Sequence, residues 1–319
     1  MANIKAIASY LPDGRLSNDD LAREFPEWTA QKIEEKTGMR TRAIASPEEC
    51  ASDLGIKAAQ KLFASKKYAP ADIDFILFCT QSPDYCLPTT ACKIQKELGL
   101  PTHCGALDFN LGCSGYVYGL SLAKGLIESG SAKNVLLITA ETYSKYIRPD
   151  DRSVRTIFSD GAAATLIGAS EISGIGDFVF GTDGTGIPNL IVPPGGTLHM
   201  NGGEIFNFTI ETIPKSLTAV LEKNKLTQES VDYFVFHQAN HYMLEHLRKK
   251  CGIPSDKFCL NMKYFGNTVS ATIPMALERA LIDKSIECFD TVVLMGFGVG
   301  YSWAATSITI GEELMNGSH

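Results

Sequence analysis

Apolar stretches of strand length alternate along the chain with segments whose apolar residues recur at helical spacing. The runs Phe75–Phe78 and Val135–Ile138 are continuously apolar, which is typical of strands in a sheet that is covered on both faces. Helical patterns at Ala58–Ser65 and Leu217–Asn224 are each followed by a further apolar run. This alternation predicts an α/β protein with a central, largely parallel sheet.

The second half of the chain repeats the pattern of the first half. The segment Asp74–Gln81 (DFILFCTQ) resembles Asp232–Gln238 (DYFVFHQ), and a helical pattern and a short polar connection precede each of them. Further along, Cys113 in Gly-Cys-Ser and Asn267 in Gly-Asn-Thr occupy equivalent places, 154 residues apart. The two halves therefore have a common plan.

Apolar runs at Ala162–Ile167 and Ala304–Ile310 end the two repeats. A repeat of about 150 residues is too long for a solenoid. We therefore predict two fused α/β units, an N-terminal unit over residues 1–170 and a C-terminal unit over residues 171–319.

Composition restricts the class of protein. The 319 residues are 45% hydrophobic and 20% charged, with a net charge of −7. These values are typical of a globular protein, and the negative charge argues against a nucleic-acid-binding protein. The segment Met1–Pro12 lacks the apolar core of a signal peptide and predicts a first strand. No run approaches the ~20 apolar residues of a membrane span, so we expect no membrane association and a cytoplasmic location.

The nine cysteines show no C-x-x-C spacing, so we expect reduced thiols rather than disulfides. Most of them, such as Cys79, Cys92 and Cys288, are expected to be buried. Cys113 differs, because an apolar segment enters Leu107–Gly115 and a helical pattern leaves it. At a strand-to-helix junction, the helix dipole and unpaired backbone N–H groups favour the thiolate. Taken alone, Cys113 is equally compatible with a packing residue.

Two residues of the second half are candidate partners of Cys113. His237 ends an apolar run and Asn267 lies in a Gly-Asn-Thr sequence. All three are expected at the C-terminal ends of strands, where open α/β sheets form their sites. An amide such as that of Asn267 can donate a hydrogen bond to a developing oxyanion, although a structural histidine and a turn asparagine are the simpler interpretations. His241 has no accompanying third ligand, so no metal is expected.

Glycines alternate in the segment Gly296–Trp303, which is predicted to lie between two strands. Alternating glycines let the backbone approach a ligand closely. The spacing is not G-x-G-x-x-G and no helix follows, so a dinucleotide site is not predicted.

Together these segments resemble the β-ketoacyl-[acyl-carrier-protein] synthase III family of thiolase-fold condensing enzymes. The resemblance implies a thiolase-like fold, whose duplicated halves form a five-layered αβαβα core, and a homodimer. Six landmarks occur in the family's order over nearly the whole chain: Lys36–Arg40, Asn110–Gly115, Ser159–Ala162, His237–Asn240, Gly266–Thr268 and Gly296–Trp303.

The resemblance also implies roles for the candidate residues. Cys113 would take an acyl group from a thioester of coenzyme A or of a carrier protein, with the backbone N–H groups of Cys113 and Val299 binding the oxyanion. His237 and Asn267 would then assist the decarboxylation of malonyl-acyl carrier protein, whose carbanion attacks the acyl-cysteine. The product would be a β-ketoacyl thioester, in fatty acid biosynthesis or a specialised acyl pathway. No metal or cofactor is implied.

Three positions depart from the family's pattern. Val299 stands where initiating members usually have glycine, and Leu87 stands where a bulky aromatic residue often enters the partner's acyl channel. Leucine there predicts a longer or branched acyl chain. Arg152 matches the arginine beside the coenzyme A adenine, but the tryptophan expected to stack on that adenine has no clear equivalent, because Trp28 lies four positions too early.

A basic cluster is the predicted docking site for acyl carrier protein, which together with acyl-coenzyme A is the expected partner. Its members are Arg248, Lys249 and Lys250. An acidic partner helix would suit this cluster electrostatically, and a solvated helix end is the equally simple interpretation.

Three other functions compete with decarboxylative condensation. An acyltransferase of the same fold would pass the acyl group to an alcohol or an amine. A cysteine hydrolase would use Cys113, His237 and Asn267 as papain-like proteases use Cys-His-Asn. A non-catalytic scaffold would have little reason to contain all three residues.

Overall fold

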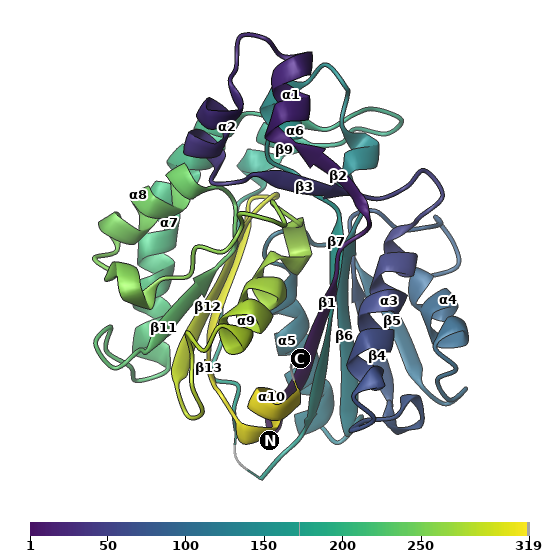
Figure 1. The fold of residues 1–319 in the computed structure, drawn as a ribbon. Helices are drawn as coiled ribbons and strands as arrows, with labels where there is room; N and C mark the ends of the chain where they lie inside the picture. Colours follow the sequence, from purple (N-terminus) through teal and green to yellow (C-terminus); the bar gives the residue numbers. More distant parts are fainter. Residues whose placement is uncertain (172, 318–319) are drawn as a thin grey trace.

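The computed structural model describes residues 1–171 and 173–317, and its longer strands form two sheets. Figure 1 shows the two sheets side by side, with helices between them and on both outer faces. The first sheet consists of β1 (Ala2–Tyr10), β7 (Gly161–Ala169), β6 (Asn134–Glu141), β4 (Phe75–Cys79) and β5 (Gly105–Phe109), in that spatial order. The second consists of β11 (Tyr233–Phe236), β12 (Thr291–Gly298), β13 (Ser302–Thr309) and β8 (Val179–Thr182).

The two sheets share one plan, as the repeat predicted. The order β1-β7-β6-β4-β5 in the first sheet corresponds to β8-β13-β12-β11 in the second, with the same parallel and antiparallel pairs. The place of β5 is taken in the second half by a single parallel bridge between Phe234 and Phe258. The predicted division at residues 170 and 171 falls between β7 and β8.

The expectation of largely parallel sheets is wrong, because both sheets are mixed. The pairs β4–β5, β4–β6 and β11–β12 are parallel, whereas β1–β7, β6–β7, β12–β13 and β8–β13 are antiparallel. Parallel neighbours need a crossover connection, but β12 returns directly into β13 through Val299–Tyr301. A tight turn of this length permits only an antiparallel pair.

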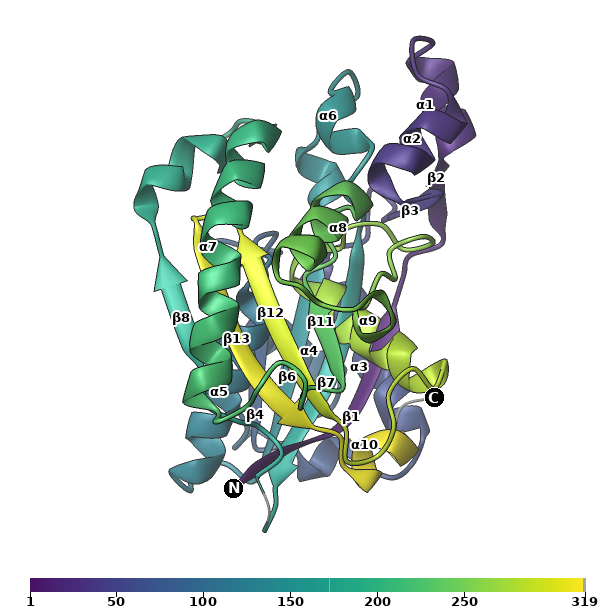
Figure 2. The same ribbon diagram turned by 90° about the vertical axis from the view of Figure 1, so that its left-hand side faces the viewer.

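Five layers result, as the predicted thiolase-like fold requires. Helices α3 (Ala51–Ala64) and α4 (Thr90–Glu97) cover the outer face of the first sheet, and α7 (Gly202–Lys223) and α8 (His241–Lys250) cover that of the second. Helices α5 (Gly115–Glu128) and α9 (Thr272–Ile282) lie between the sheets (Figure 2). The remaining α-helices are α1 (Asn18–Glu24), α2 (Ala30–Thr37), α6 (Arg152–Arg155) and α10 (Glu312–Gly317). The remaining strands form two pairs, β2 (Gly14–Ser17) with β3 (Thr41–Ile44) and β9 (Leu190–Ile191) with β10 (His199–Met200).

Alternation along the buried strands explains the layers. Along β6, Val135 and Leu137 join the cluster between the sheets, whereas Leu136 and Ile138 join the cluster beneath α3 and α4. Residues of β12 divide in the same way between the central cluster and that beneath α7 and α8. Successive side chains of a strand point to opposite faces, so a continuously apolar strand joins two cores at once.

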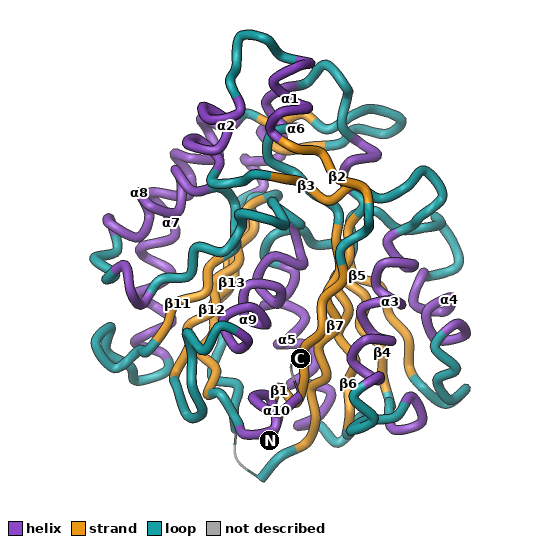
Figure 3. Tube along the Cα trace, in the orientation of Figure 1, coloured by secondary structure: helices purple, strands orange, loops and turns teal. Residues whose placement is uncertain are grey.

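The end of the molecule at which the parallel strands finish carries most of the irregular structure. Figure 3 shows loops, the β2–β3 pair and the short helices α1, α2 and α6 gathered at this end. The predicted first strand is confirmed as β1, which runs from the opposite end into the β2–β3 pair. Within the described residues, no helix is long and apolar enough to cross a membrane.

The expected burial of most cysteines is wrong. Among the nine, only Cys79, Cys113 and Cys259 are buried, while Cys92 is exposed and Cys288 is partly exposed. Cys92 lies in α4, a helix at the edge of the fold (Figure 1), whose buried residues are Thr90, Ala91 and Ile94.

Candidate active site

Cys113 lies in the short connection between β5 and α5, two residues before the helix begins. Its exposed fraction is 5%. The connection is tight, since a Cβ atom on Gly115 would lie 2.3 Å from Sγ of Cys79. The strand-to-helix junction predicted for Cys113 is therefore confirmed.

The alternating glycines lie against this cysteine. A Cβ atom on Gly298 would lie 2.8 Å from Sγ of Cys113, and one on Gly296 would lie 2.7 Å from the Cys113 carbonyl oxygen. Gly298 also has a φ of +157°. Contrary to the prediction, Gly296 and Gly298 belong to β12, and only Val299–Tyr301 lie between the strands. The glycines thus let the end of β12 pack directly on Cys113.

The backbone N–H groups of Cys113 and Val299 act on the pKa of the Cys113 thiol, and Gly298, the residue before Val299, lies against its sulfur. Burial raises the pKa of the thiol to about 12, while these two N–H groups lower it. The lowered pKa expected at a helix N-terminus is therefore not found, because loss of solvation outweighs the backbone dipoles. The resting cysteine is a neutral thiol held beside two donors.

His237 follows β11 directly and is 2% exposed. Its Nδ1 lies 2.7 Å from the hydroxyl of Thr272, which also lies 3.1 Å from the Val269 carbonyl oxygen. Burial lowers the pKa of His237 to about 3, so the ring is neutral near pH 7. The Thr272 hydroxyl has one proton, which it donates to the Val269 carbonyl oxygen in this arrangement, so that its oxygen accepts from Nδ1–H. When the hydroxyl turns to donate to Nδ1 instead, the ring proton is on Nε2, and Nε2 becomes a hydrogen-bond donor.

Asn267 is 4% exposed and its amide is held in one orientation. Its Oδ1 accepts from the Val269 N–H at 2.9 Å, and its Nδ2 donates to the Ala239 carbonyl oxygen at 3.3 Å. One N–H of the amide is therefore left to face a ligand. The prediction that Asn267 lies at the end of a sheet strand is wrong. Asn267 lies in a loop that forms an isolated bridge with Phe158.

Glu141, which the sequence analysis missed, connects the two halves beneath the site. Its carboxyl group accepts hydrogen bonds from Ser270 Oγ at 2.8 Å, from Ser82 Oγ at 3.0 Å and from the Gln81 N–H at 3.0 Å. Burial raises its pKa to about 8 and these hydrogen bonds oppose the shift. Its only sequence signal is one acidic residue ending an apolar strand.

We expect Glu141 to make stability fall with rising pH. The folded protein keeps this proton up to about pH 8, whereas an unfolded chain releases it near 4.5, so the stabilising contribution is complete below pH 4.5 and lost as pH rises through 8. Between pH 7 and 8, where the unfolded chain keeps little of the His237 proton, the free energy of unfolding should fall by roughly 1 kcal/mol. Glu141→Gln should flatten this dependence in denaturant titrations, and an unchanged slope would show that another group causes it.

Cys113, His237 and Asn267 line one cavity of about 90 Å³, here called the central pocket. Two neighbouring cavities share walls with it. The outer pocket, of about 510 Å³, shares Ile157 and Asn240, and the inner pocket, of about 140 Å³, shares Leu190. The three candidate catalytic residues therefore meet between a wider and a smaller cavity.

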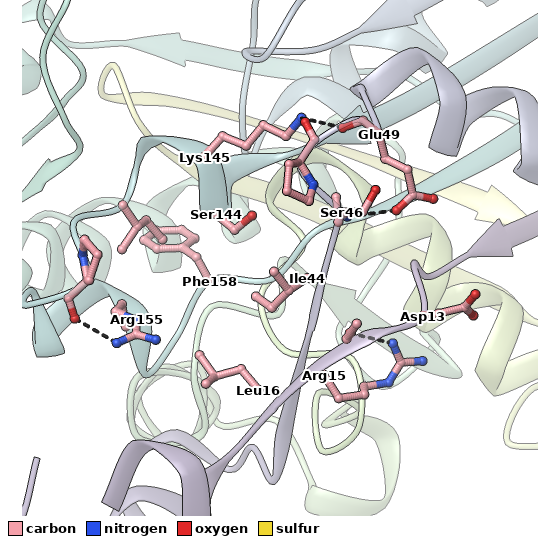
Figure 4. Close-up of a pocket in the computed structure, with 15 residues that line it drawn as sticks. Asp13, Arg15, Leu16, Ile44, Ser46, Glu49, Ser144, Lys145, Arg155 and Phe158 are labelled. Atoms are coloured by element: carbon pink, nitrogen blue, oxygen red, sulfur yellow. Dashed lines mark hydrogen bonds between the residues drawn. The ribbon is translucent and has the colours of Figure 1, made fainter. Parts of the chain in front are cut away.

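A larger cavity of about 900 Å³ lies beside these three but does not contain Cys113 (Figure 4). Phe158 lines both this cavity and the central pocket. Two charged side chains that line the larger cavity are bound to neighbouring groups. Lys145 donates to the Pro47 and Glu49 carbonyl oxygens, and Arg155 pairs with Glu24. The cavity is therefore next to the site but separated from it by a buried ring.

Trp28, which lies four positions too early in sequence for the expected tryptophan, nevertheless lies beside Arg152 in the structure. Both residues line the outer pocket, and the Arg152 guanidinium lies 4.9 Å from the ring centroid of Trp28. Lys36 and Lys32 lie 4.8 and 5.3 Å from the same ring. The segment between α1 and α2 brings the ring to the pocket in spite of its shift in sequence. An aromatic plane surrounded by cations suits a nucleotide that carries phosphates.

We expect Trp28→Ala to raise KM for acyl-coenzyme A about tenfold with little change in kcat, since stacking on one base contributes roughly 1–3 kcal/mol. Acyl-pantetheine, which lacks the nucleotide, should show no such change in steady-state kinetics. Equal losses for both substrates would show that Trp28 does not bind the nucleotide.

The other predicted substrate-binding residues lie away from the central pocket. Leu87 is 82% exposed, so its predicted role depends on a second subunit. Arg248 is held internally, because it bonds to Glu245 through two nitrogens at 3.0 Å and donates to the Ile253 carbonyl oxygen. Lys249 and Lys250 are exposed at the C-terminal end of α8.

His241 is exposed at the start of α8, where its Cβ packs on Gly38, which has a φ of +77° and ends α2. Within residues 1–171 and 173–317, no group of three histidine, cysteine or carboxylate side chains is placed to bind a metal ion.

Comparison with known families agrees with this geometry. The family described as 3-oxoacyl-[acyl-carrier-protein (ACP)] synthase III matches residues 107–184, and the family of its C-terminal part matches residues 221–310. This chain belongs to the 3-oxoacyl-, or β-ketoacyl-, [acyl-carrier-protein] synthase III family. Members of this family are acyltransferases that catalyse a condensation in fatty acid biosynthesis.

Relatives match the chain over almost its whole length. The β-ketoacyl-[acyl-carrier-protein] synthase III of Deinococcus deserti is 38% identical over 314 residues, covering 95% of this chain and 89% of its own. A crystal structure of a 3-oxoacyl-(acyl-carrier-protein) synthase III is 49% identical, with a TM-score of 0.94 over 97% of this chain and 99% of its own. The synthase from Burkholderia xenovorans LB400 is 38% identical, with a TM-score of 0.93 over 98% of this chain and 95% of its own.

Proposed function

We propose that this member of the synthase III family loads an acyl group onto Cys113 and condenses it with a malonyl thioester. One observation carries the proposal: a buried thiol beside two backbone N–H groups shares a 90 Å³ cavity with a neutral histidine and an oriented asparagine amide. A nucleophile, an oxyanion site and a second pair of donors are the groups that two successive acyl-transfer steps need.

In the first step, Cys113 Sγ attacks the thioester carbonyl and forms a new S–C bond. The S–C bond to coenzyme A breaks, and the thiol proton is transferred to the leaving thiolate. The N–H groups of Cys113 and Val299 lower the pKa of the thiol, and we place them as the donors to the oxygen that becomes negative on the attacked carbonyl. Since Cys113 is neutral at rest, removal of its proton is part of the activation barrier.

In the second step, the malonyl thioester loses carbon dioxide. The electron pair of the broken C–C bond stays on the former methylene carbon, and an enolate forms. His237 and Asn267 donate to the enolate oxygen, which requires the His237 tautomer with the proton on Nε2. The carbon then attacks the acyl-Cys113 carbonyl, the S–C bond breaks, and the Cys113 thiolate takes up a proton. Burial of both donors strengthens these hydrogen bonds, because little water competes for them.

A homodimer is part of the proposal. Strand β5 is at the edge of the first sheet and pairs only with β4 among the described strands. Its Leu107 is 45% exposed, and Leu87 is more exposed still. An edge strand with exposed apolar residues favours pairing with a second copy. Such a dimer would bring Leu87 to the partner's acyl pocket.

An acyl carrier protein is the proposed donor of the malonyl group. Lys249 and Lys250 are at one end of α8, and the outer pocket opens beside its other end at Asn240 and Tyr242. A ten-residue helix is about 15 Å long. A carrier held at the two lysines would therefore deliver its thioester arm from the rim of the pocket.

The test is to record the intact mass of the protein after incubation with acyl-coenzyme A, and then to add malonyl-acyl carrier protein. A mass gain followed by its loss, with release of carbon dioxide and a β-ketoacyl product, would support the proposal. A mass gain that is discharged only by an alcohol or an amine would favour non-condensing acyl transfer. Discharge by water alone would favour a hydrolase, and no mass gain from any donor would contradict all three.

A further inference from the structure

We infer that the acyl group loaded onto Cys113 is short and carries a neutral oxygen, as a hydroxyl or carbonyl group, rather than being a plain alkyl chain. This inference rests on the proposed function and names its acyl substrate class. The inner pocket carries the argument through its position, its hydrogen-bonding groups, its lack of charge and its size.

The inner pocket adjoins the loop that holds the nucleophile, although Cys113 itself does not line it. A Cβ atom on Gly112, the residue before Cys113, would lie 2.5 Å from Oε1 of Gln81 and 2.6 Å from Cγ1 of Val299. Both side chains therefore pack against the loop that holds the sulfur, and both line the inner pocket. Leu190 lines this pocket and the central pocket together. An acyl chain on Cys113 that turns away from the entrance would pass between these residues.

Polar side chains line the inner pocket in a connected chain. The Tyr143 hydroxyl donates to Gln81 Oε1 at 2.5 Å, and Gln81 Nε2 donates to Asn110 Oδ1 at 3.1 Å. Tyr146 donates to the Gln81 backbone carbonyl oxygen at 3.4 Å. These bonds fix the orientation of both amides. They leave the second N–H of Gln81 Nε2 and the Nδ2 group of Asn110 as donors, and the Tyr143 oxygen as an acceptor.

The lining carries no formal charge. Among the described residues, those that line this pocket include no lysine, arginine, aspartate or glutamate. A carboxylate on the acyl chain would meet no cation here. A plain alkyl chain would offer the amide donors no acceptor. A hydroxyl or carbonyl oxygen satisfies the donors and adds no charge.

The volume of the inner pocket restricts the length of the chain. A cavity of about 150 Å³ accommodates a molecule the size of benzene, and this pocket measures about 140 Å³. The buried ring of Tyr143 packs against Phe158, with ring centroids 5.3 Å apart, so this wall is fixed. An acyl group of four or five heavy atoms with one oxygen fits this space. The inference therefore departs from the longer or branched chain that the resemblance implied through Leu87.

The experiment compares matched coenzyme A thioesters by the rate at which they acylate Cys113, measured by intact mass. The probes are butanoyl-, 3-hydroxybutanoyl-, 4-hydroxybutanoyl- and acetoacetyl-coenzyme A. We expect at least one oxygen-bearing probe to react about tenfold faster than butanoyl-coenzyme A or more, because a site built to bind a hydroxyl discriminates against the analogue that lacks it. Gln81→Met and Tyr143→Phe should bring the ratio close to one. Tyr10→Phe, which removes a distant hydroxyl, should leave the ratio unchanged.

The ratio measured on the unmodified protein decides the inference even where a variant does not fold. If butanoyl-coenzyme A reacts at least as fast as every oxygen-bearing probe, the inference is wrong while the proposed function stands. If no probe acylates Cys113, the proposed function itself fails. A preference that persists in both Gln81→Met and Tyr143→Phe would also overturn the inference, because its source would then be elsewhere.

Discussion

Replacing Cys113 with alanine is expected to abolish acyl-enzyme formation and to reduce condensation by at least about a thousandfold, since no other group in the central pocket is a nucleophile of comparable strength. The measurement is intact mass after incubation with acyl-coenzyme A, together with the rate of β-ketoacyl product formation. Folding of the variant is checked by its thermal unfolding.

Cys79 provides the matched control for this experiment. It is also fully buried and its Sγ donates to the Leu111 carbonyl oxygen at 3.1 Å, in the same loop as Cys113. Burial raises the pKa of this thiol well above its ordinary value, and it does not line the central pocket. Cys79→Ala should therefore still gain the mass of one acyl group. Acyl transfer that survives in Cys113→Ala but not in Cys79→Ala would reverse the assignment of the nucleophile.

Replacing His237 or Asn267 with alanine is expected to separate the two half-reactions. Each variant should lose about 100- to 1,000-fold in the condensation rate, the usual effect of removing one donor to an oxyanion. Acylation of Cys113 should stay close to the unmodified rate, because the donors of that step are backbone groups. The measurement is single-turnover acylation, followed by carbon dioxide release from malonyl-acyl carrier protein.

The control is His241→Ala, which changes an exposed histidine four residues further along the same segment. It should leave both half-reactions unaffected. A large fall in the acylation rate of His237→Ala would mean that the imidazole removes the Cys113 proton. The assignment of His237 to the second step alone would then be wrong.

Much of this architecture was predictable, because it depends on patterns that are local in sequence. Apolar runs such as Val135–Ile138 identified the sheet strands, and the equivalence of Cys113 with Asn267 identified the duplication that both sheets display. The junction that holds Cys113 was predictable for the same reason. Strand direction was not, since it depends on whether a turn or a crossover joins two strands.

The features that sequence did not predict arise from contacts between distant segments. The pKa of Cys113 depends on burial by β12, which lies about 180 residues further along the chain. Trp28 reaches Arg152 only because the loops at one end of the sheets fold together. Glu141 gains its partners from two separate segments, residues 81–82 and Ser270. None of these environments has a local pattern, so a single sequence does not reveal them.

One residue, Val269, positions both side-chain donors of the second half-reaction. Its N–H binds Asn267 and its carbonyl oxygen lies beside the Thr272 hydroxyl that contacts His237. With a φ of +54° on a β-branched residue, it occupies a conformation that costs about 1–3 kcal/mol. His237 and Asn267 are therefore thermodynamically coupled, and the effects of their substitutions should not add independently. An evolutionary substitution in this turn would therefore change the positions of both donors together.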